Sequence, residues 1–247
     1  MITNEENISV EKINVKYSEM DHNLALKPYS LLNFLQDIAS ENAEKLGFGY
    51  SFVSKNNLAW FLIKYRMEFN DYPVNVLNLT LKTQPRGYNK LFAYREFELY
   101  ENEKILGRVF SVWTLVDINS RQPVLIGNTI QNKDMSLLVK KEDDLSFGKL
   151  RAVENPSITK QFEVRYNDLD VNGHANNGNY IIWAFEPLTL DFKTKHKIKT
   201  LDMMFKKEAK YGEKITVEIA YKDELTTIHT IKNSENEDLC FVECSWI

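Results

Sequence analysis

The stretch Arg165-Tyr166-Asn167-Asp168-Leu169-Asp170-Val171-Asn172-Gly173-His174-Ala175-Asn176-Asn177 places carboxylate, amide and imidazole groups between two apolar segments. A run typical of a β-strand precedes it at residues 158–164, and an apolar run typical of a helix follows it at residues 180–190. In an extended chain Asp170, Asn172 and His174 would point to the same side, because side chains alternate with a period of two. The alternative is a polar turn that caps the following helix.

The same pattern occurs once before in the chain. Val15-Lys16-Tyr17-Ser18-Glu19-Met20-Asp21-His22-Asn23 aligns with residues 164–172, and Asp21 and Asp170 are 149 residues apart (170 − 21). Apolar residues at spacings of three and four follow in both copies, which predicts a helix over residues 31–46 as well as the later one.

The two copies differ where chemistry would be expected. At the same offset Ala25 stands at the position of His174, so the first copy keeps the acid and the amide but has lost the imidazole. Histidine is the side chain that most readily carries a proton near neutral pH. We therefore expect one reactive site, in the second half, and a binding role for the first half.

Runs with strand character follow each helix. They cover residues 58–69, 76–83, 91–100 and 105–116 in the first half, and 199–207, 214–221, 226–232 and 239–246 in the second. One helix followed by antiparallel strands, twice over, predicts an α+β fold rather than a parallel α/β sheet.

This organisation predicts two domains. The first covers residues 1–141 and includes a connecting arm that begins near residue 119 and carries a short helix at 134–139. A linker at residues 142–157 leads to the second domain at residues 158–247.

Composition narrows the functional class. A net charge of −4 and a pI of about 5.7 give no overall basic field for nucleic acid. The N-terminus lacks the basic start and apolar run of a signal peptide, and no apolar stretch approaches the ~20 residues that span a membrane. We expect a cytoplasmic protein without membrane insertion.

The two cysteines, Cys240 and Cys244, are four residues apart on a predicted strand. They would lie too far apart for a disulfide and are expected to be reduced core residues.

Other kinds of active site are not indicated. The chain has no G-x-S-x-G elbow and no glycine loop that would bind phosphate. Its four histidines show no metal-ligand spacing, so neither a metal nor a cofactor is predicted. His196 and His229 are expected at the surface.

The residues 168–177 resemble the D-L-D-V-N-x-H-x-N-N signature of the acyl-acyl carrier protein (acyl-ACP) thioesterases of bacteria and plant plastids. In that family the signature precedes the central helix of the second of two hotdog folds. The similarity extends to residues 31–49 and 60–73, to Gly107-Arg108 with Trp113, and to Lys206-Lys207-Glu208, so it covers most of the chain. It implies a tandem hotdog, in which each half is an antiparallel sheet wrapped around a central helix.

The resemblance also implies an activity: hydrolysis of fatty acyl-ACP to free fatty acid and acyl carrier protein, a step of fatty acid biosynthesis. Asp170, Asn172 and His174 would be catalytic, joined by Glu208, which matches a second carboxylate of the family. Plant members often have a cysteine after that glutamate, where this chain has Ala209, so a mechanism without cysteine is expected. Water, or Asp170 itself, would attack the thioester.

Substrate binding is expected in three places. Asn176 and Asn177 begin the second helix, whose free N–H groups suit a developing oxyanion. The first half would hold the acyl chain. Its predicted lining residues are Leu32, Leu35, Ile38 and Ala39 on the helix and Phe61, Ile63 and Tyr65 on a strand. The acidic carrier protein would dock on a group of lysines, namely Lys193, Lys195, Lys197, Lys199, Lys206 and Lys207. A homodimer is possible.

Three other functions fit the same features. A thioesterase acting on coenzyme A thioesters and a hydratase on the same scaffold are the nearest alternatives. A sensor that binds acyl thioesters without hydrolysing them is another; it would need a DNA-binding segment or a basic patch, and neither is evident.

Overall fold

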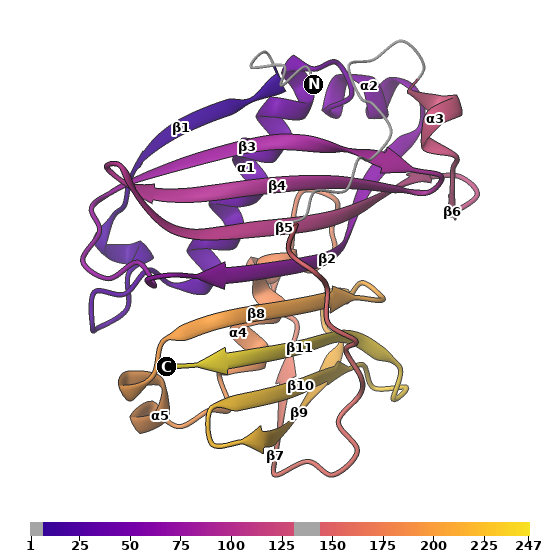
Figure 1. Cartoon of the computed structure of the whole chain (residues 1–247). Coiled ribbons are helices and arrows are strands. Elements are labelled where there is room, and N and C mark those ends of the chain that lie inside the picture. The colour runs from indigo at the N-terminus through magenta and orange to yellow at the C-terminus, as the bar shows by residue number, and fades with distance from the viewer. Residues whose placement is uncertain (1–6, 131–143) are drawn as a thin grey trace.

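One antiparallel sheet of eleven strands runs through the computed structural model, which describes residues 7–130 and 144–247 (Figure 1). The predicted helix at 134–139 lies outside these residues. The first half contributes β1 (Ser9–Asn14), β2 (Leu58–Phe69), β3 (Asn78–Asn89), β4 (Phe92–Glu101), β5 (Lys104–Asp117) and β6 (Gln122–Pro123). The second contributes β7 (Ile158–Glu163), β8 (Ile198–Phe205), β9 (Lys214–Asp223), β10 (Thr226–Lys232) and β11 (Asp238–Trp246).

The strand order joins the two halves edge to edge. It is β1-β3-β4-β5-β2-β8-β11-β10-β9-β7, with β6 paired to β5. The halves meet where β2 pairs antiparallel with β8, from Lys64 opposite Met204 to Glu68 opposite Thr200. The edge strand β2 of the first half is thus paired with the edge strand β8 of the second, so the sheet is continuous across both halves.

Two long helices, α1 (Pro28–Lys45) and α4 (Asn177–Phe185), lie on the same face of the sheet, one over each half (Figure 1). Leu32 and Leu35 of α1 are completely buried, as is Ala184 of α4, so both helices bury apolar stripes against the strands. Shorter helices follow: α2 (Tyr50–Lys55), α3 (Ile126–Thr129) and α5 (Leu190–Lys195). Together they form the predicted α+β double hotdog.

The internal repeat is visible in the backbone. The 3₁₀ turns η2 (Tyr17–Glu19) and η3 (Tyr166–Asp168) precede α1 and α4 at the same offset. The isolated bridge between Met20 and Leu26 has its counterpart between Leu169 and Ala175. The predicted duplication is therefore confirmed in this part of the fold.

The second central helix is shorter than predicted. The apolar pattern indicates a helix over residues 180–190, but α4 ends at Phe185 and α5 starts at Leu190. Pro187 explains the break, because proline has no N–H to donate and its ring clashes with the preceding turn.

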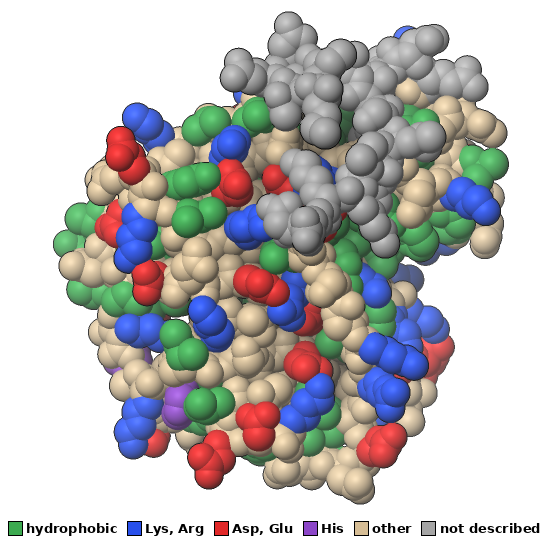
Figure 2. All heavy atoms as spheres, in the orientation of Figure 1, with side chains coloured by type: hydrophobic (Ala, Val, Ile, Leu, Met, Phe, Trp, Pro, Cys, Tyr) green, Lys and Arg blue, Asp and Glu red, His purple; other side chains and the backbone are tan. Residues whose placement is uncertain are grey.

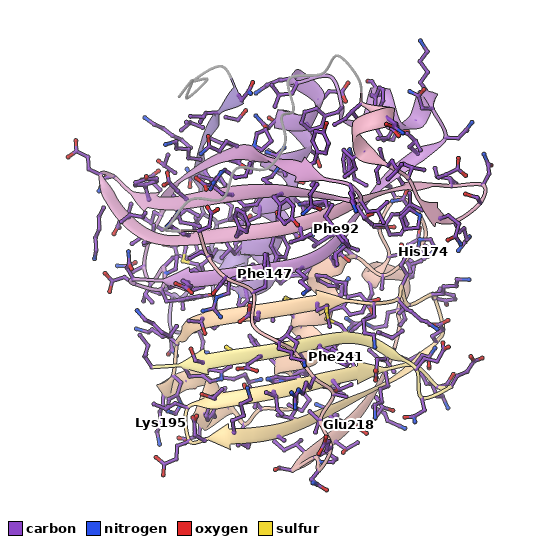
Figure 3. The ribbon with its side chains drawn as sticks, turned by 45° about the vertical axis from the view of Figure 1, so that its right-hand side comes forward. Phe92, Phe147, His174, Lys195, Glu218 and Phe241 are labelled. Atoms are coloured by element: carbon purple, nitrogen blue, oxygen red, sulfur yellow. The ribbon has the colours of Figure 1, made fainter. Side chains whose placement is uncertain are left out.

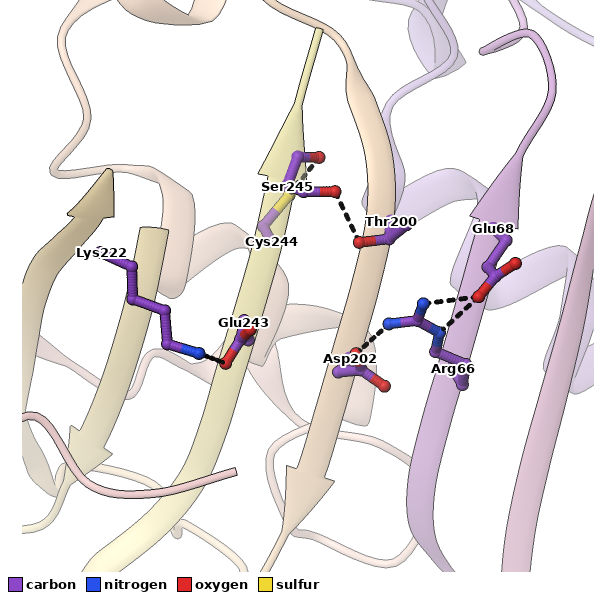
Figure 4. Close-up of polar contacts among 8 residues, drawn as sticks. All are labelled: Arg66, Glu68, Thr200, Asp202, Lys222, Glu243, Cys244 and Ser245. Atoms are coloured by element: carbon purple, nitrogen blue, oxygen red, sulfur yellow. Dashed lines mark hydrogen bonds and ion pairs between the residues drawn. The ribbon is translucent and has the colours of Figure 1, made fainter. Parts of the chain in front are cut away.

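An ion pair crosses the junction between the halves. Arg66 of β2 bonds Asp202 of β8 directly opposite it, and its Nε donates to Glu68 Oε1 at 3.0 Å (Figure 4). Burial raises the pKa of Asp202, while the Arg66 guanidinium opposes that shift. The junction therefore depends on a charge pair within the sheet as well as on backbone hydrogen bonds.

Residues 144–157, which lead into β7, run over the face of the sheet opposite the helices (Figure 1). Phe147, labelled in Figure 3, packs on Phe110 with ring centres 5.9 Å apart. Further along, the Val153 N–H donates to Thr230 Oγ1 at 2.7 Å. Val153 thus satisfies the hydroxyl of Thr230, a fully buried residue of β10.

His229 of β10 is fully buried, so the prediction of a surface position is wrong. Its Nδ1 contacts the Ala184 carbonyl at 2.8 Å, and its Nε2 contacts Thr227 Oγ1 at 2.9 Å. These two polar partners satisfy the hydrogen-bonding groups of the imidazole inside the hotdog. Burial lowers the pKa of His229 to about 3.

Among the described residues, no helix is long and apolar enough to span a bilayer.

Candidate active site

Residues 169–175 form a tight turn rather than the extended segment that the sequence suggested. The Asp170 carboxylate accepts backbone N–H groups from Asn172 at 2.8 Å and from His174 at 3.2 Å. Gly173 has a φ of +76°, the left-handed conformation that glycine adopts without strain. Asp170, Asn172 and His174 are therefore grouped by a turn and not by strand alternation.

The first copy of the motif forms the same turn. Asp21 accepts the N–H groups of Asn23 at 2.8 Å and of Ala25 at 2.9 Å. Leu24, at the position of Gly173, also has a positive φ, of 59°. The aspartate of this motif therefore builds the loop in both halves, whether or not an imidazole follows.

His174 and Glu208 lie side by side. His174 Nδ1 is 3.4 Å from Glu208 Oε1, within the range of an ion pair. The two loops are tied by their backbones, because the Ala175 N–H donates to the Ala209 carbonyl at 2.9 Å. With Nδ1 facing a carboxylate, the Nε2 atom of His174 remains to act on a water or a substrate. Figure 3 shows His174 where the two halves of the molecule meet.

The environment of Glu208 makes it easier to protonate than an ordinary glutamate. Partial burial raises its pKa and nearby Asp170 raises it further, while His174, Arg121 and Lys210 act in the opposite direction. Glu208 therefore interacts electrostatically with groups from both halves of the chain. Arg121, which lies in the turn between β5 and β6 of the first half, was not predicted, because nothing in its local sequence marks it.

A cavity of about 550 Å³ extends into the first half from the loop that carries His174. Asn172 lines it, so the reactive loop of the second half opens into the interior of the first. The other walls come mainly from apolar and aromatic side chains of α1, α2 and the strands. They include Ala39, Ala43, Phe48, Val53, Trp60 and Trp113. Arg95 also lines the cavity and bonds Asn42 Oδ1 at 2.6 Å.

The predicted lining of this cavity is only partly right. Ala39 lines it, whereas Leu32, Leu35 and Ile38 are buried in the core and are not among its lining residues. The three predicted strand residues, Phe61, Ile63 and Tyr65, are not lining residues either. A β-bulge between Leu62 and Lys64 interrupts the in-and-out alternation of side chains along β2. The side on which residues before the bulge lie therefore does not predict the side of those after it.

The start of α4 is less open than predicted. Asn176 is the N-cap of the helix, and its side chain accepts the Gly178 N–H at 2.8 Å. A Cβ on Gly178 would lie 2.9 Å from the Tyr29 ring of α1, so this end of α4 is packed against the other half. The Gly178 N–H is therefore not available for an oxyanion. Asn177 is the first helical residue and remains a predicted binding residue.

Neither cysteine is placed to act as a nucleophile. Cys240 and Cys244 are free thiols buried in the core, as predicted, and burial raises the pKa of both. Ala209, next to Glu208, is also buried, and its N–H donates to the Tyr180 hydroxyl at 2.8 Å. Within the described residues no group of three or more His, Cys, Asp or Glu side chains is arranged to hold a metal ion.

The lysines predicted as a docking group do not form one patch. Lys206 and Lys207, next to Glu208, pair with Asp238 at 3.1 Å and Glu237 at 2.5 Å. Lys195 lies on α5, away from His174 at the other side of the molecule (Figure 3). On the face shown in Figure 2, basic and acidic side chains are interspersed.

These features define a double hotdog protein with an imidazole–carboxylate pair beside a largely apolar cavity. Residues 6–133 match the acyl-ACP thioesterase N-terminal domain, and residues 151–247 match the acyl-ACP thioesterase C-terminal domain. The chain belongs to the acyl-ACP thioesterase family.

Known proteins agree with this assignment. The chain is 21% identical over 220 residues to the chloroplastic oleoyl-acyl carrier protein thioesterase of Coriandrum sativum, covering 82% of this chain and 60% of that protein. It is 22% identical over 237 residues to oleoyl-acyl carrier protein thioesterase 2 of Arabidopsis thaliana, covering 89% and 63%. The chain thus spans about 60% of the length of these relatives.

Two solved structures share the whole fold. The crystal structure of an acyl-ACP thioesterase from Bacteroides thetaiotaomicron superposes with a TM-score of 0.89 at 21% identity and covers 100% of both chains. The 12:0-ACP thioesterase from Umbellularia californica gives a TM-score of 0.82 at 18% identity, covering 98% of this chain and 97% of that one. At these identities the likeness defines the fold.

Proposed function

We propose that this protein hydrolyses fatty acyl-ACP thioesters to free fatty acid and acyl carrier protein. The observation that carries the proposal is the His174–Glu208 pair, 3.4 Å apart. His174 lies on the loop whose Asn172 lines the cavity of the first half. An acyl chain in that cavity would place its thioester at the loop. The cavity volume is within the roughly 300–1,000 Å³ of small-molecule sites.

In the proposed reaction water is the nucleophile. His174 Nε2 takes a proton from the water as its oxygen bonds the thioester carbonyl carbon, and Glu208 stabilises the imidazolium through Nδ1. The tetrahedral intermediate then collapses, the C–S bond breaks, and the imidazolium returns the proton to the departing thiolate. Water is favoured over Asp170 because the Asp170 Oδ1 atom already accepts two backbone hydrogen bonds.

The carrier protein is the proposed partner. Arg121 and Lys210 are exposed beside Glu208, one from each half, and both act on its pKa. A cationic pair at this position suits the phosphate of a carrier-bound pantetheine arm and the acidic surface of the carrier itself. This pair takes over the docking role that the sequence assigned to the six lysines.

A thiol-release assay tests the function. The same saturated acyl chain is offered on carrier protein and on coenzyme A, over a ladder of chain lengths, to the wild type and to His174→Ala. Release from acyl-ACP that the variant lacks supports the proposal. Faster release from coenzyme A would favour the alternative thioesterase, and binding of acyl-ACP without release would favour the sensor.

A further inference from the structure

A second, larger cavity of about 890 Å³ lies where the two halves meet and is lined by residues of both. Its walls are mainly apolar and come from α4, α5, the first turns of α1 and the end of β11. They include Tyr29, Phe34, Ile181, Ile182, Phe185, Leu190 and Trp246. His174, Asn172 and Glu208 do not line it.

The two cavities are related by the internal repeat. The first lies between the later part of α1, α2, the start of β2 and Trp113 of β5. The second lies between the end of α4, α5, the start of β8 and Trp246 of β11. Each is reached by the motif loop of the opposite half, through Asn172 in one case and through Asp21 and His22 in the other.

The second cavity lacks the reactive pair that lies beside the first. Ala25 replaces the histidine of the motif. The Leu26 N–H donates to the Pro73 carbonyl at 2.9 Å, as the Ala175 N–H does to Ala209, so Tyr72 stands where the other half has Glu208. The Tyr72 hydroxyl donates to the Leu26 carbonyl at 2.7 Å. Neither an imidazole nor a carboxylate occupies these two positions.

The mouth of the cavity carries basic groups from both halves. His22 Nε2 is 3.2 Å from Thr194 Oγ1, and Asn23 Nδ2 donates to the Thr194 carbonyl at 3.3 Å, so the first motif loop is held against α5. His196 and Lys197 follow α5 and line the cavity. His196 bonds the backbone through Nδ1 only, and Lys197 has no ion pair within the described part of the chain.

The acidic groups that line the same cavity are largely engaged. The Asp21 carboxylate accepts the N–H groups of its own turn, and Glu19 accepts the Lys16 N–H at 2.6 Å. Glu186 lies 3.7 Å from Lys193. Burial and neighbouring Glu41 raise the pKa of Asp37. Lys27 also lines the cavity, and its Nζ donates to the Ser18 carbonyl at 2.9 Å. Among the described residues, Lys197 is therefore the lining lysine whose side chain has neither a hydrogen bond nor an ion pair.

We propose that this second cavity binds a long-chain fatty acid, with the carboxylate at His196 and Lys197 and the chain between α4 and the start of α1. The ligand would be held without being hydrolysed, because the positions of His174 and Glu208 are taken by Ala25 and Tyr72. The site goes beyond the proposed function: it concerns binding alone and would exist whether or not the protein cleaves thioesters.

Equilibrium dialysis with radiolabelled palmitate tests the site without any thioester. We expect two equivalents on the wild type. Ile182→Trp, which fills the second cavity from a position 37% exposed, should bind one, and Ala43→Trp, which fills the first, should also bind one. Circular dichroism and thermal unfolding confirm that each variant is folded.

A charge reversal tests the head-group contact. In the Ala43→Trp background, Lys197→Glu should weaken palmitate binding by about tenfold or more, a loss of about 1.4 kcal/mol. Lys195→Glu is the matched control, because Lys195 pairs with Asp191 at 2.8 Å and does not line the cavity, so it should leave binding unchanged. Hexadecanol, which has no carboxylate, should bind less tightly and ignore both changes.

Two results overturn the proposal: one equivalent on the wild type that Ala43→Trp abolishes, or two equivalents that Ile182→Trp and Lys197→Glu leave unchanged. Neither result bears on thioester cleavage. A protein that binds two palmitates but releases no thiol would instead refute the proposed function and keep the second site.

Discussion

Asp21 and Asp170 hold their loops by the same two hydrogen bonds, although they belong to different halves of the chain. Each carboxylate accepts the N–H groups two and four residues further on, at 2.8 and 2.9 Å for Asp21 and at 2.8 and 3.2 Å for Asp170. The first loop has no imidazole to serve, yet it keeps this geometry. The aspartate therefore has a structural role that does not depend on hydrolysis.

Asp170→Asn separates this role from that of a nucleophile. Asparagine keeps the Oδ1 acceptor of the turn but cannot form an acyl-enzyme anhydride. We expect thiol release within about tenfold of the wild type, because the turn persists and water attacks. Asp170→Ala should lose about 1–3 kcal/mol of unfolding free energy with its two hydrogen bonds. Urea unfolding and the thiol-release assay measure the two effects.

The repeat supplies the control for that experiment. Asp21→Ala removes the corresponding two hydrogen bonds in a loop without His174, so it measures the structural cost alone. A loss of more than about a thousandfold for Asp170→Asn, with unchanged unfolding, would show that the carboxylate acts in the reaction itself.

The carboxylate beside His174 predicts the acid limb of the pH–activity profile, in which kcat/KM falls as the pH is lowered. Burial and Asp170 raise the pKa of Glu208 above the usual glutamate value of 4.5. The ionised form supports the imidazole, so activity is present above that raised pKa and is lost as the pH falls through it. We expect kcat/KM to decline from a pH above 4.5, and Glu208→Gln to lower kcat/KM by about 10²–10⁴ and to alter the limb.

A nearby glutamate provides the comparison. Glu213 accepts the Lys210 N–H at 3.1 Å, whereas the carboxylate paired with His174 is that of Glu208. Glu213→Gln should leave the acid limb in place. An unaltered limb in Glu208→Gln would assign the titration to another group, and an unaltered kcat/KM as well would remove Glu208 from the mechanism.

Much of the fold follows from short-range patterns. The predicted bounds of β2 and β10 agree with the structure to the residue, because both strands are continuous apolar or alternating runs between clear breaks. The constant offset of the motif also predicted the internal repeat, although not that each copy would form a turn. The fold class needed no more than these patterns and the resemblance.

Other features depend on tertiary contacts that no local pattern reports. The offset of 149 fails after the helices, because α1 has 18 residues and α4 has 9. Tyr72 and Glu208 are therefore 136 residues apart (208 − 72), and their equivalence shows only in the backbone bonds around them. Likewise, His229 is buried by a helix and Arg121 approaches Glu208 from the other half.

The cavity of the first half should determine which acyl chains are accepted. Ala43 lines it from α1, so Ala43→Phe adds a ring where the chain would lie. We expect thiol release from long-chain acyl-ACP to fall relative to release from short-chain acyl-ACP. The added ring reduces the space in the cavity, so long acyl chains no longer fit while short ones still do. Rates over a ladder of chain lengths give the profile.

Ala220 offers the same substitution elsewhere. It lies on β9 and lines neither cavity, so Ala220→Phe should keep the wild-type profile. If both variants shift the profile alike, the cavity of the first half is not the acyl site.

The buried His229 should make the protein sensitive to acid. Its pKa is lowered to about 3, so it stays neutral in the folded state, whereas in the unfolded chain it takes up a proton near pH 6.5. Its contribution is fully present above about pH 6.5 and is lost as the pH falls from there toward 3. Between pH 7 and pH 5, protonation linked to this one group should lower the free energy of unfolding by about 2 kcal/mol.

Urea unfolding of His229→Gln at both pH values tests that assignment. The variant should be less stable at pH 7 and lose about 2 kcal/mol less on acidification than the wild type. His22→Gln, at an exposed histidine, should follow the wild type. Parallel losses in all three proteins would mean that His229 is protonated in the folded state.

The Arg66–Asp202 pair should behave as a buried charge pair at the junction of the halves. The side chains are 19% and 7% exposed, so removing the cation leaves Asp202 without compensation in a dry position. We expect Arg66→Met to cost about 3–5 kcal/mol of unfolding free energy, whereas Arg66→Met with Asp202→Leu should be nearly neutral. Urea unfolding of both single variants and the double variant gives the coupling free energy.

Lys222→Met with Glu243→Leu, at the more exposed pair of Figure 4, is the control and should show a coupling free energy below about 1 kcal/mol. Additive single losses at Arg66 and Asp202 would mean that this charge pair does not stabilise the junction of the halves.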